Sequence, residues 1–265
     1  MYDLTYRKPA TLEEAARLLE ADEDAQIVAG GMTLVPTLKL RLAQPTQLVD
    51  LSAIDTLHGI RDQGTAIEIG AMTRHADVAG SALVQEKIPA LAHLASRIGD
   101  PQVRHRGTLG GSVANSDPAA DYPAGVLGLG ATIVTNRREI AADDFFLDLF
   151  ETALDPGEIL AAIRFPVPTR CGYVKFPNPA SRYAIVGVFV ADFGGNCRVA
   201  VTGAGPCAFR VPAYEAALTE RFADDALAGI EIDGGQFNGD LHATPEYRAH
   251  LVGVMAKRAV QAAGG

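Results

Sequence analysis

The sequence predicts an α+β fold made of two domains that meet near Pro168. Three observations over the 265 residues lead to this prediction. Short helices and strands alternate around glycine-rich turns in the first part of the chain. A proline pair, Pro166 and Pro168, directly follows a predicted strand, and three further strands and two helices come after it. We therefore expect one domain at residues 1–168 and a smaller one at residues 169–265.

The first elements are a helix, a strand and a glycine turn. Thr11-Leu-Glu-Glu14 is a capping box ahead of apolar residues with helical spacing, which predicts a helix that begins at Thr11. The apolar run Ala25–Ala29 predicts a strand that leads into Gly30-Gly31. Because ligands often bind at strand ends in such α/β elements, this turn is a candidate site.

The middle of the chain combines strands with an interrupted helix. Strand composition covers Gln47–Leu51 and Ala66–Ile69, with a short connection between them. Apolar residues at spacings of three and four predict a helix over Ser81–Ile98, interrupted at Pro89 and ended near Gly99.

A glycine-rich stretch with six glycines runs from Gly107 to Gly130. We interpret its beginning as a second loop with exposed backbone amides. Strands are expected at Ala131–Thr135 and Ile159–Phe165.

The C-terminal part predicts an antiparallel sheet followed by two helices. Its strands are expected at Gly172–Phe176, Tyr183–Asp192 and Cys197–Thr202, with Gly194-Gly195-Asn196 as a turn, and its helices at Pro212–Phe222 and Pro245–Ala263. Thr244 is the expected N-cap of the last helix, because Pro245 suits the first helical position.

Composition excludes several classes of function. The net charge is −9 and Lys and Arg do not cluster, which argues against a nucleic-acid partner. No apolar run reaches the roughly 18 residues that a membrane-spanning helix needs. The first ten residues lack the apolar centre of a signal peptide, so we expect a cytoplasmic protein.

The cysteines and histidines do not indicate a metal site. Cys171, Cys197 and Cys207 cannot complete a four-cysteine site; a mixed site with histidine stays arithmetically possible, but buried inert thiols explain them better. His75, His93 and His105 show no metal-ligand spacing and no Ser-His-Asp arrangement, and each is expected to be a surface or satisfied side chain. His105 is the exception, because it lies where its ring could contact a ligand.

Two glycine pairs could hold a phosphate. In Ala29-Gly-Gly-Met-Thr33 the glycines allow positive φ and close approach of backbone amides to an oxyanion, although such a pair is more often only a turn. Gly110-Gly111, flanked by Thr108 and Ser112, forms the second candidate. Together they predict a diphosphate ligand, although neither fits the Rossmann or P-loop pattern.

Two aspartates follow the second glycine pair. A carboxylate at Asp121 could accept hydrogen bonds from ribose or ribityl hydroxyls. Asp117 could do the same or form only an Asp-Pro turn.

The two glycine segments and their surroundings identify a family resemblance. Ala29–Leu34, and Arg104–Ser112 continuing through Ala114–Asp121, closely resemble the FAD-binding medium subunit of molybdenum hydroxylases, the group of carbon monoxide dehydrogenase and bacterial xanthine dehydrogenase. Further segments stand in the family's order and cover nearly the whole chain: Asp144-Phe-Phe146, Gly157–Leu160, Ile163–Pro166, Ser181–Val186, Thr202–Pro206 and Tyr247-Arg248.

The resemblance implies a fold and a cofactor site. The fold is an FAD domain of the vanillyl-alcohol-oxidase (PCMH) type, with FAD between two α+β subdomains, followed by a C-terminal domain like that of carbon monoxide dehydrogenase flavoproteins. The residues implied to bind FAD are Ala29, Gly30, Gly31, Met32, Thr33, Leu34, Thr108, Leu109, Gly110, Gly111, Ser112, Asp121, Leu160, Lys175 and Tyr183. Met32 departs from the Gln, His or Thr that the family usually has, so only backbone contact is expected there. Tyr183 could stack on the isoalloxazine or serve as a core tyrosine.

The resemblance also implies a function. A large molybdopterin-binding subunit would hydroxylate the substrate, a small subunit would carry two [2Fe-2S] clusters, and this chain would pass electrons from FAD to an acceptor, in a dimer of heterotrimers. No catalytic side chain and no metal ligand is required from this chain, because the flavin supplies the redox chemistry. Two alternatives stay open: a free-standing flavoprotein oxidoreductase, and a noncatalytic nucleotide-binding or assembly module.

Overall fold

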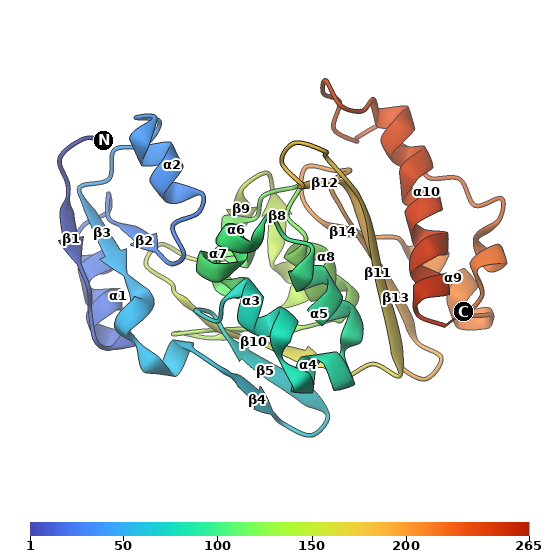
Figure 1. Cartoon of the computed structure of the whole chain (residues 1–265), viewed down its shortest axis with the longest axis horizontal. Helices are drawn as coiled ribbons and strands as arrows, with labels where there is room; N and C mark the ends of the chain where they lie inside the picture. Colours follow the sequence, from blue (N-terminus) through green and yellow to red (C-terminus); the bar gives the residue numbers. More distant parts are fainter. Residues whose placement is uncertain (265) are drawn as a thin grey trace.

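The N-terminal part of the chain is a small parallel sheet with two helices. The computed structural model describes residues 1–264. The strands β1 (Thr5–Arg7), β2 (Gln26–Val28) and β3 (Gln47–Asp50) pair in the order β1-β3-β2, with α1 (Leu12–Glu20) and α2 (Leu34–Lys39) between them (Figure 1). The Thr11 hydroxyl accepts the Glu14 N–H at 3.2 Å, which confirms the predicted start of α1.

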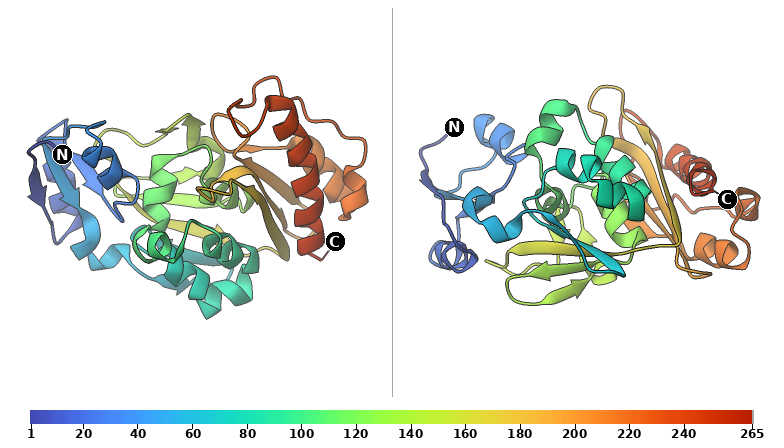
Figure 2. Two further views of the ribbon diagram at one scale, coloured as in Figure 1. Left: turned by 45° about the horizontal axis from the view of Figure 1, so that its top comes forward. Right: turned by 60° about the horizontal axis from the view of Figure 1, so that its bottom comes forward.

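The middle part is a five-stranded antiparallel sheet with helices on one face (Figures 1 and 2). The sheet order is β4-β5-β10-β6-β7, from Ile60–Asp62, Ala66–Gly70, Leu160–Pro166, Thr132–Thr135 and Glu139–Ala141. The helices are α3 (His75–Gly80), α4 (Ala82–Lys87), α5 (Pro89–Ser96), α6 (Pro101–Arg106), α7 (Leu109–Asn115) and α8 (Tyr122–Gly128). A small hairpin, β8 (Phe146–Asp148) and β9 (Glu151–Thr152), precedes β10.

The C-terminal part is a four-stranded antiparallel sheet between two layers of helices. Its strands are β11 (Arg170–Pro177), β12 (Ala184–Asp192), β13 (Cys197–Thr202) and β14 (Phe209–Arg210), and its helices are α9 (Pro212–Glu220) and α10 (Pro245–Ala262). Helix α10 covers one face and α5 and α8 pack toward the other (Figure 2), so every residue of β12 is buried. A β-carbon on Gly172 would lie 2.0 Å from the Ala259 carbonyl oxygen, which explains a glycine in β11.

The buried apolar residues form three clusters, one of which crosses the predicted domain boundary. The N-terminal cluster surrounds Val49, and the C-terminal cluster fills the space under α10. The largest cluster joins the helices of the middle part to Tyr173 and Phe189 of the C-terminal sheet. The middle and C-terminal parts thus share one core, and the division at Pro168 stays a prediction.

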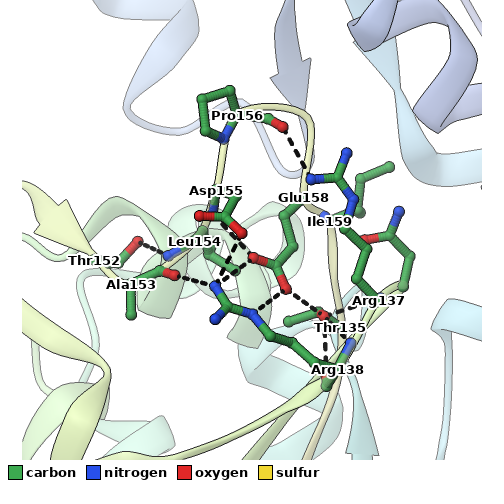
Figure 3. Close-up of polar contacts among 11 residues, drawn as sticks. Thr135, Arg137, Arg138, Thr152, Ala153, Leu154, Asp155, Pro156, Glu158 and Ile159 are labelled. Carbon is green, nitrogen blue, oxygen red and sulfur yellow. Dashed lines mark hydrogen bonds and ion pairs between the residues drawn. The ribbon is translucent and has the colours of Figure 1, made fainter.

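An ion pair closes the loop that leads into β10. The Glu158 carboxylate is buried and accepts hydrogen bonds from both Nε and Nη2 of Arg138, at 3.1 and 3.0 Å, and from the Thr135 hydroxyl at 2.7 Å (Figure 3). The Asp155 N–H also donates to it at 2.9 Å. These hydrogen bonds, with that from Arg138 as the strongest influence, lower the pKa of Glu158 to about 2.

Most sequence-predicted elements are confirmed, but the interpretation of the second glycine segment as a loop is wrong. Residues 109–115 form helix α7, which the Thr108 hydroxyl caps through the Gly111 N–H. Packing requires glycine at position 110, because a β-carbon there would lie 2.5 Å from that of Ala71. The same holds for Gly128 in α8, where a β-carbon would lie 2.8 Å from the Phe189 ring. Several short elements, such as α2, α3, α6 and the β8–β9 hairpin, were not predicted, because their apolar patterns are too brief.

Candidate functional site

A cavity of about 460 Å³ opens where the three parts of the chain meet. Its walls come from the β2–α2 turn, the region from α6 to the start of α8, and the β11–β12 turn. Among the sequence-predicted residues, Ala29, Gly30, Gly31, Met32, Thr33, Leu34, Thr108, Gly111, Ser112, Asp121 and Tyr183 line it. A cavity of this size suits a cofactor-sized ligand.

The β2–α2 turn presents unused backbone donors to the cavity. Within residues 1–264, the N–H groups of Gly30, Gly31, Met32 and Thr33 donate no hydrogen bond. Gly31 has a φ of +72°, which a residue with a side chain rarely adopts. Gly30 lies against the neighbouring segment so closely that a β-carbon would stand 2.2 Å from the Arg106 carbonyl oxygen. The turn therefore offers a row of amides to an oxyanion.

The start of α7 forms the facing wall. The Leu109 and Gly110 amides are already used, since they donate to the carbonyls of Thr73 and Ala71 at 2.9 and 2.8 Å. Leu109 is fully buried, and neither residue lines the cavity. Gly111 lines the cavity and faces Ala29. A β-carbon added to Gly111 would lie 3.4 Å from the Ala29 β-carbon. The two glycine segments are thus brought together, as predicted, although only part of the second one is open to a ligand.

The Asp121 carboxylate is part of a buried ion pair and is not a free hydrogen-bond acceptor. Lys175 Nζ lies 2.8 Å from one carboxylate oxygen, and the Tyr173 hydroxyl donates to the same group. Burial raises the pKa of Asp121, while the Lys175 ammonium and the Tyr173 hydroxyl oppose that rise. Asp117 forms the expected turn, in which its carboxylate accepts the Ala119 N–H at 2.9 Å, and it also lines the cavity, so both interpretations stay open.

Lys175 and Leu160 lie outside the cavity wall. Besides Asp121, the Lys175 ammonium donates to the carbonyls of Arg97 and Arg182 at 2.9 and 2.8 Å, so its three protons are all in use. It anchors the β11–β12 turn to the end of α5. Leu160 is buried in β10, opposite Thr135.

Tyr183 stands on that turn, with 42% of its surface exposed. It lines the main cavity and also a second one of about 260 Å³ on the side of the C-terminal part. Burial of the phenol, together with the charges of Asp117 and Asp121, raises the pKa of Tyr183. It is therefore not the core tyrosine of the alternative interpretation, and its ring is available to a ligand.

His75 is a cavity residue that the sequence did not reveal. It begins α3, is 4% exposed, and lines the cavity beside Gly107. His105, which sequence reasoning favoured, is exposed on α6 and does not line the cavity. The sequence did contain one signal for His75. It follows the predicted strand Ala66–Ile69 by a few residues, so the strand-end argument that located Gly30 applies to it as well.

The residues present fit FAD. The β2–α2 turn with its free amides faces the start of α7 across the cavity, which suits a pyrophosphate, and the half-exposed Tyr183 on the wall of the same cavity suits a flat ring. Within residues 1–264, His, Cys, Asp and Glu side chains form no group of three that could hold a metal ion, and no helix there is long and apolar enough to cross a membrane.

Comparison with known proteins decides the family. Residues 2–168 match the model of the FAD binding domain in molybdopterin dehydrogenase. The chain belongs to this family. FAD is its cofactor, and the fold and family predicted from the glycine segments are confirmed.

Full-length relatives support the same assignment. The medium chain of carbon monoxide dehydrogenase from Hydrogenophaga pseudoflava is 36% identical, over 97% of this chain and 96% of that one. The medium subunit of nicotine 6-hydroxylase from Paenarthrobacter nicotinovorans is 35% identical, over 98% and 97%. A chain of reconstituted CO dehydrogenase from Oligotropha carboxidovorans superposes with a TM-score of 0.89 at 34% identity, covering 99% of this chain and 98% of that one. The protein is accordingly an oxidoreductase subunit of the molybdenum hydroxylase type.

Proposed function

We propose that this chain carries FAD in a molybdenum hydroxylase, takes electrons from [2Fe-2S] clusters of a small partner subunit, and passes them to an external acceptor. The meeting of the two glycine segments around one cavity is the observation that carries the proposal. FAD supplies the redox chemistry when bound. The chain's own residues bind and orient it, and none of them is required as an acid, base or nucleophile.

Within the cavity we assign the pyrophosphate to the amides of Gly30–Thr33 and the wall at Thr108, Gly111 and Ser112. The isoalloxazine is assigned to the side of Tyr183, whose phenol ring would cover one face of it. Because Tyr183 also lines the second cavity, an acceptor could approach the flavin from that side. Asp121 and Lys175 act on the site by fixing the β11–β12 turn.

We also propose assembly with a large molybdopterin-binding subunit and a small iron–sulfur subunit, as a dimer of heterotrimers in the cytoplasm. Relatives that this chain matches over nearly their whole length are named medium chain or medium subunit. The β8–β9 hairpin supports a role in assembly, because Leu147, Leu149 and Phe150 are all more than half exposed.

The test is to purify the chain and measure flavin. A yellow protein with a flavin spectrum, or a colourless one that takes up added FAD with one-to-one stoichiometry, is expected. A folded chain that takes up no FAD would contradict the proposed site and favour the noncatalytic module. Co-purification from the native host, read by mass spectrometry, tests the partners: absence of a molybdopterin subunit would favour a free-standing flavoprotein.

A further inference from the structure

His75 has an environment that nothing in the chain itself accounts for. Its ring packs on Gly107, where a β-carbon would lie 2.5 Å from Nε2, and against the Tyr122 ring at a centroid distance of 5.3 Å. Nδ1 is completely buried and has no hydrogen-bond partner within residues 1–264. Buried polar atoms of this kind are uncommon and call for an explanation.

The charge state of the ring follows from its surroundings. Burial, and after it the positive charge of Arg104, lowers the pKa of His75 to about 4. The imidazole is therefore neutral near pH 7 and carries a single proton, on one of its two nitrogens.

The position of that proton follows from the cost of burial. An N–H donor buried without an acceptor loses its hydrogen bonds to water, and orphaned N–H groups are rarer in proteins than acceptors with an unused lone pair. Nδ1, which has no partner, is thus the unprotonated nitrogen. Nε2 carries the proton at the cavity wall beside Gly107 and Thr108.

We propose that His75 donates a hydrogen bond from Nε2–H to an oxygen of the FAD pyrophosphate. This inference rests on the proposed function, because it needs FAD in the cavity. The backbone that carries the ring is held in place by two contacts. The main-chain N–H of His75 donates to the Gly107 carbonyl at 3.0 Å, and Arg74 forms a β-bridge with Thr108. The histidine is thereby attached to the same segment that forms the second glycine wall.

The first experiment compares FAD affinity among variants of the full chain. His75→Leu removes the donor and should weaken FAD binding at least about tenfold, the scale of a hydrogen bond to a charged group. His75→Gln restores a side-chain N–H and should recover part of that loss. His105→Leu, on the exposed face of α6, is the matched control and should bind like the wild type.

Thermal unfolding of each apo variant shows whether it is folded. Folded His75→Leu that binds FAD as tightly as the wild type would overturn the proposal while leaving the proposed function intact. A wild-type chain that binds no FAD would overturn both. If His75→Leu does not fold, the proposal is tested by a spectroscopic measurement on the wild-type chain.

That measurement is ¹⁵N NMR of histidine-labelled wild-type chain, titrated with ADP and with FAD. We expect the His75 ring to be a neutral Nε2–H tautomer and its Nε2–H resonance to shift with both probes, because both contain the diphosphate. A proton on Nδ1, or a resonance that moves with neither, would overturn the proposal. A response to FAD alone would contradict the assignment to the pyrophosphate.

Discussion

Asp121 and Lys175 form an ion pair, with 2.8 Å between a carboxylate oxygen and Nζ, in which both side chains are at least 96% buried. The pair joins the start of α8, in the middle part, to β11 in the C-terminal sheet. Lys175 at the same time holds the Arg182 carbonyl, next to Tyr183. Two residues that the family resemblance implies to contact FAD thus also hold the turn on which Tyr183 stands.

Lys175→Met should lower the free energy of unfolding by about 3–5 kcal/mol, because it leaves the Asp121 carboxylate buried without its partner. FAD affinity should fall as well, since the β11–β12 turn loses its anchor. Denaturant unfolding and FAD titration measure the two effects. The double variant Asp121→Asn with Lys175→Met removes both charges and should recover much of the stability. Equal stability of the single and double variants would show that the buried charge is not the cause.

Glu158→Gln should remove a stabilisation that depends on pH. The pKa of Glu158 is about 2 in the folded chain and near 4.5 when unfolded, so its contribution is fully present above pH 4.5 and is lost as the pH falls toward 2. The loss at pH 7 should be about 2–3 kcal/mol. The variant should accordingly show less acid destabilisation than the wild type between pH 5 and 2. Parallel stability curves for the two chains over that range would contradict this role.

The predictions that succeeded depend on interactions between residues close in the sequence, and those that failed depend on interactions between residues far apart in the sequence. The helix after Thr11 and the turn at Gly194 follow from local chemistry, and both are as expected. The interpretation of the second glycine segment as a loop was wrong because Gly110 is required by packing against Ala71, which is far away in the sequence. His75 was missed for the same reason, since only the folded chain shows that its ring is buried beside Gly107. Asp121 and Lys175 were both identified as site residues, but the ion pair between them was not predicted.

Gly111→Val should abolish FAD retention without unfolding the C-terminal core. The added β-carbon would lie 2.9 Å from the Thr108 hydroxyl oxygen and 3.4 Å from the Ala29 β-carbon, so the branch narrows the gap between the two glycine walls. The flavin absorbance of the purified protein measures the loss. Gly80→Ala is the matched control, because its β-carbon meets nothing within 4 Å and should leave flavin content unchanged. A yellow Gly111→Val would place the pyrophosphate elsewhere.

Tyr183→Ala should weaken FAD binding by roughly 2- to 12-fold, the worth of about 0.5–1.5 kcal/mol from an aromatic stack, while the melting temperature of the apo chain changes little. The small effect on stability is expected because the side chain is half exposed. Tyr183→Phe keeps the ring and should bind FAD like the wild type. Isothermal titration of the three apo chains with FAD and with ADP separates ring contact from phosphate contact, because ADP lacks the isoalloxazine. If Tyr183→Ala weakens ADP as much as FAD, the tyrosine acts on the turn as a whole and does not stack on the flavin.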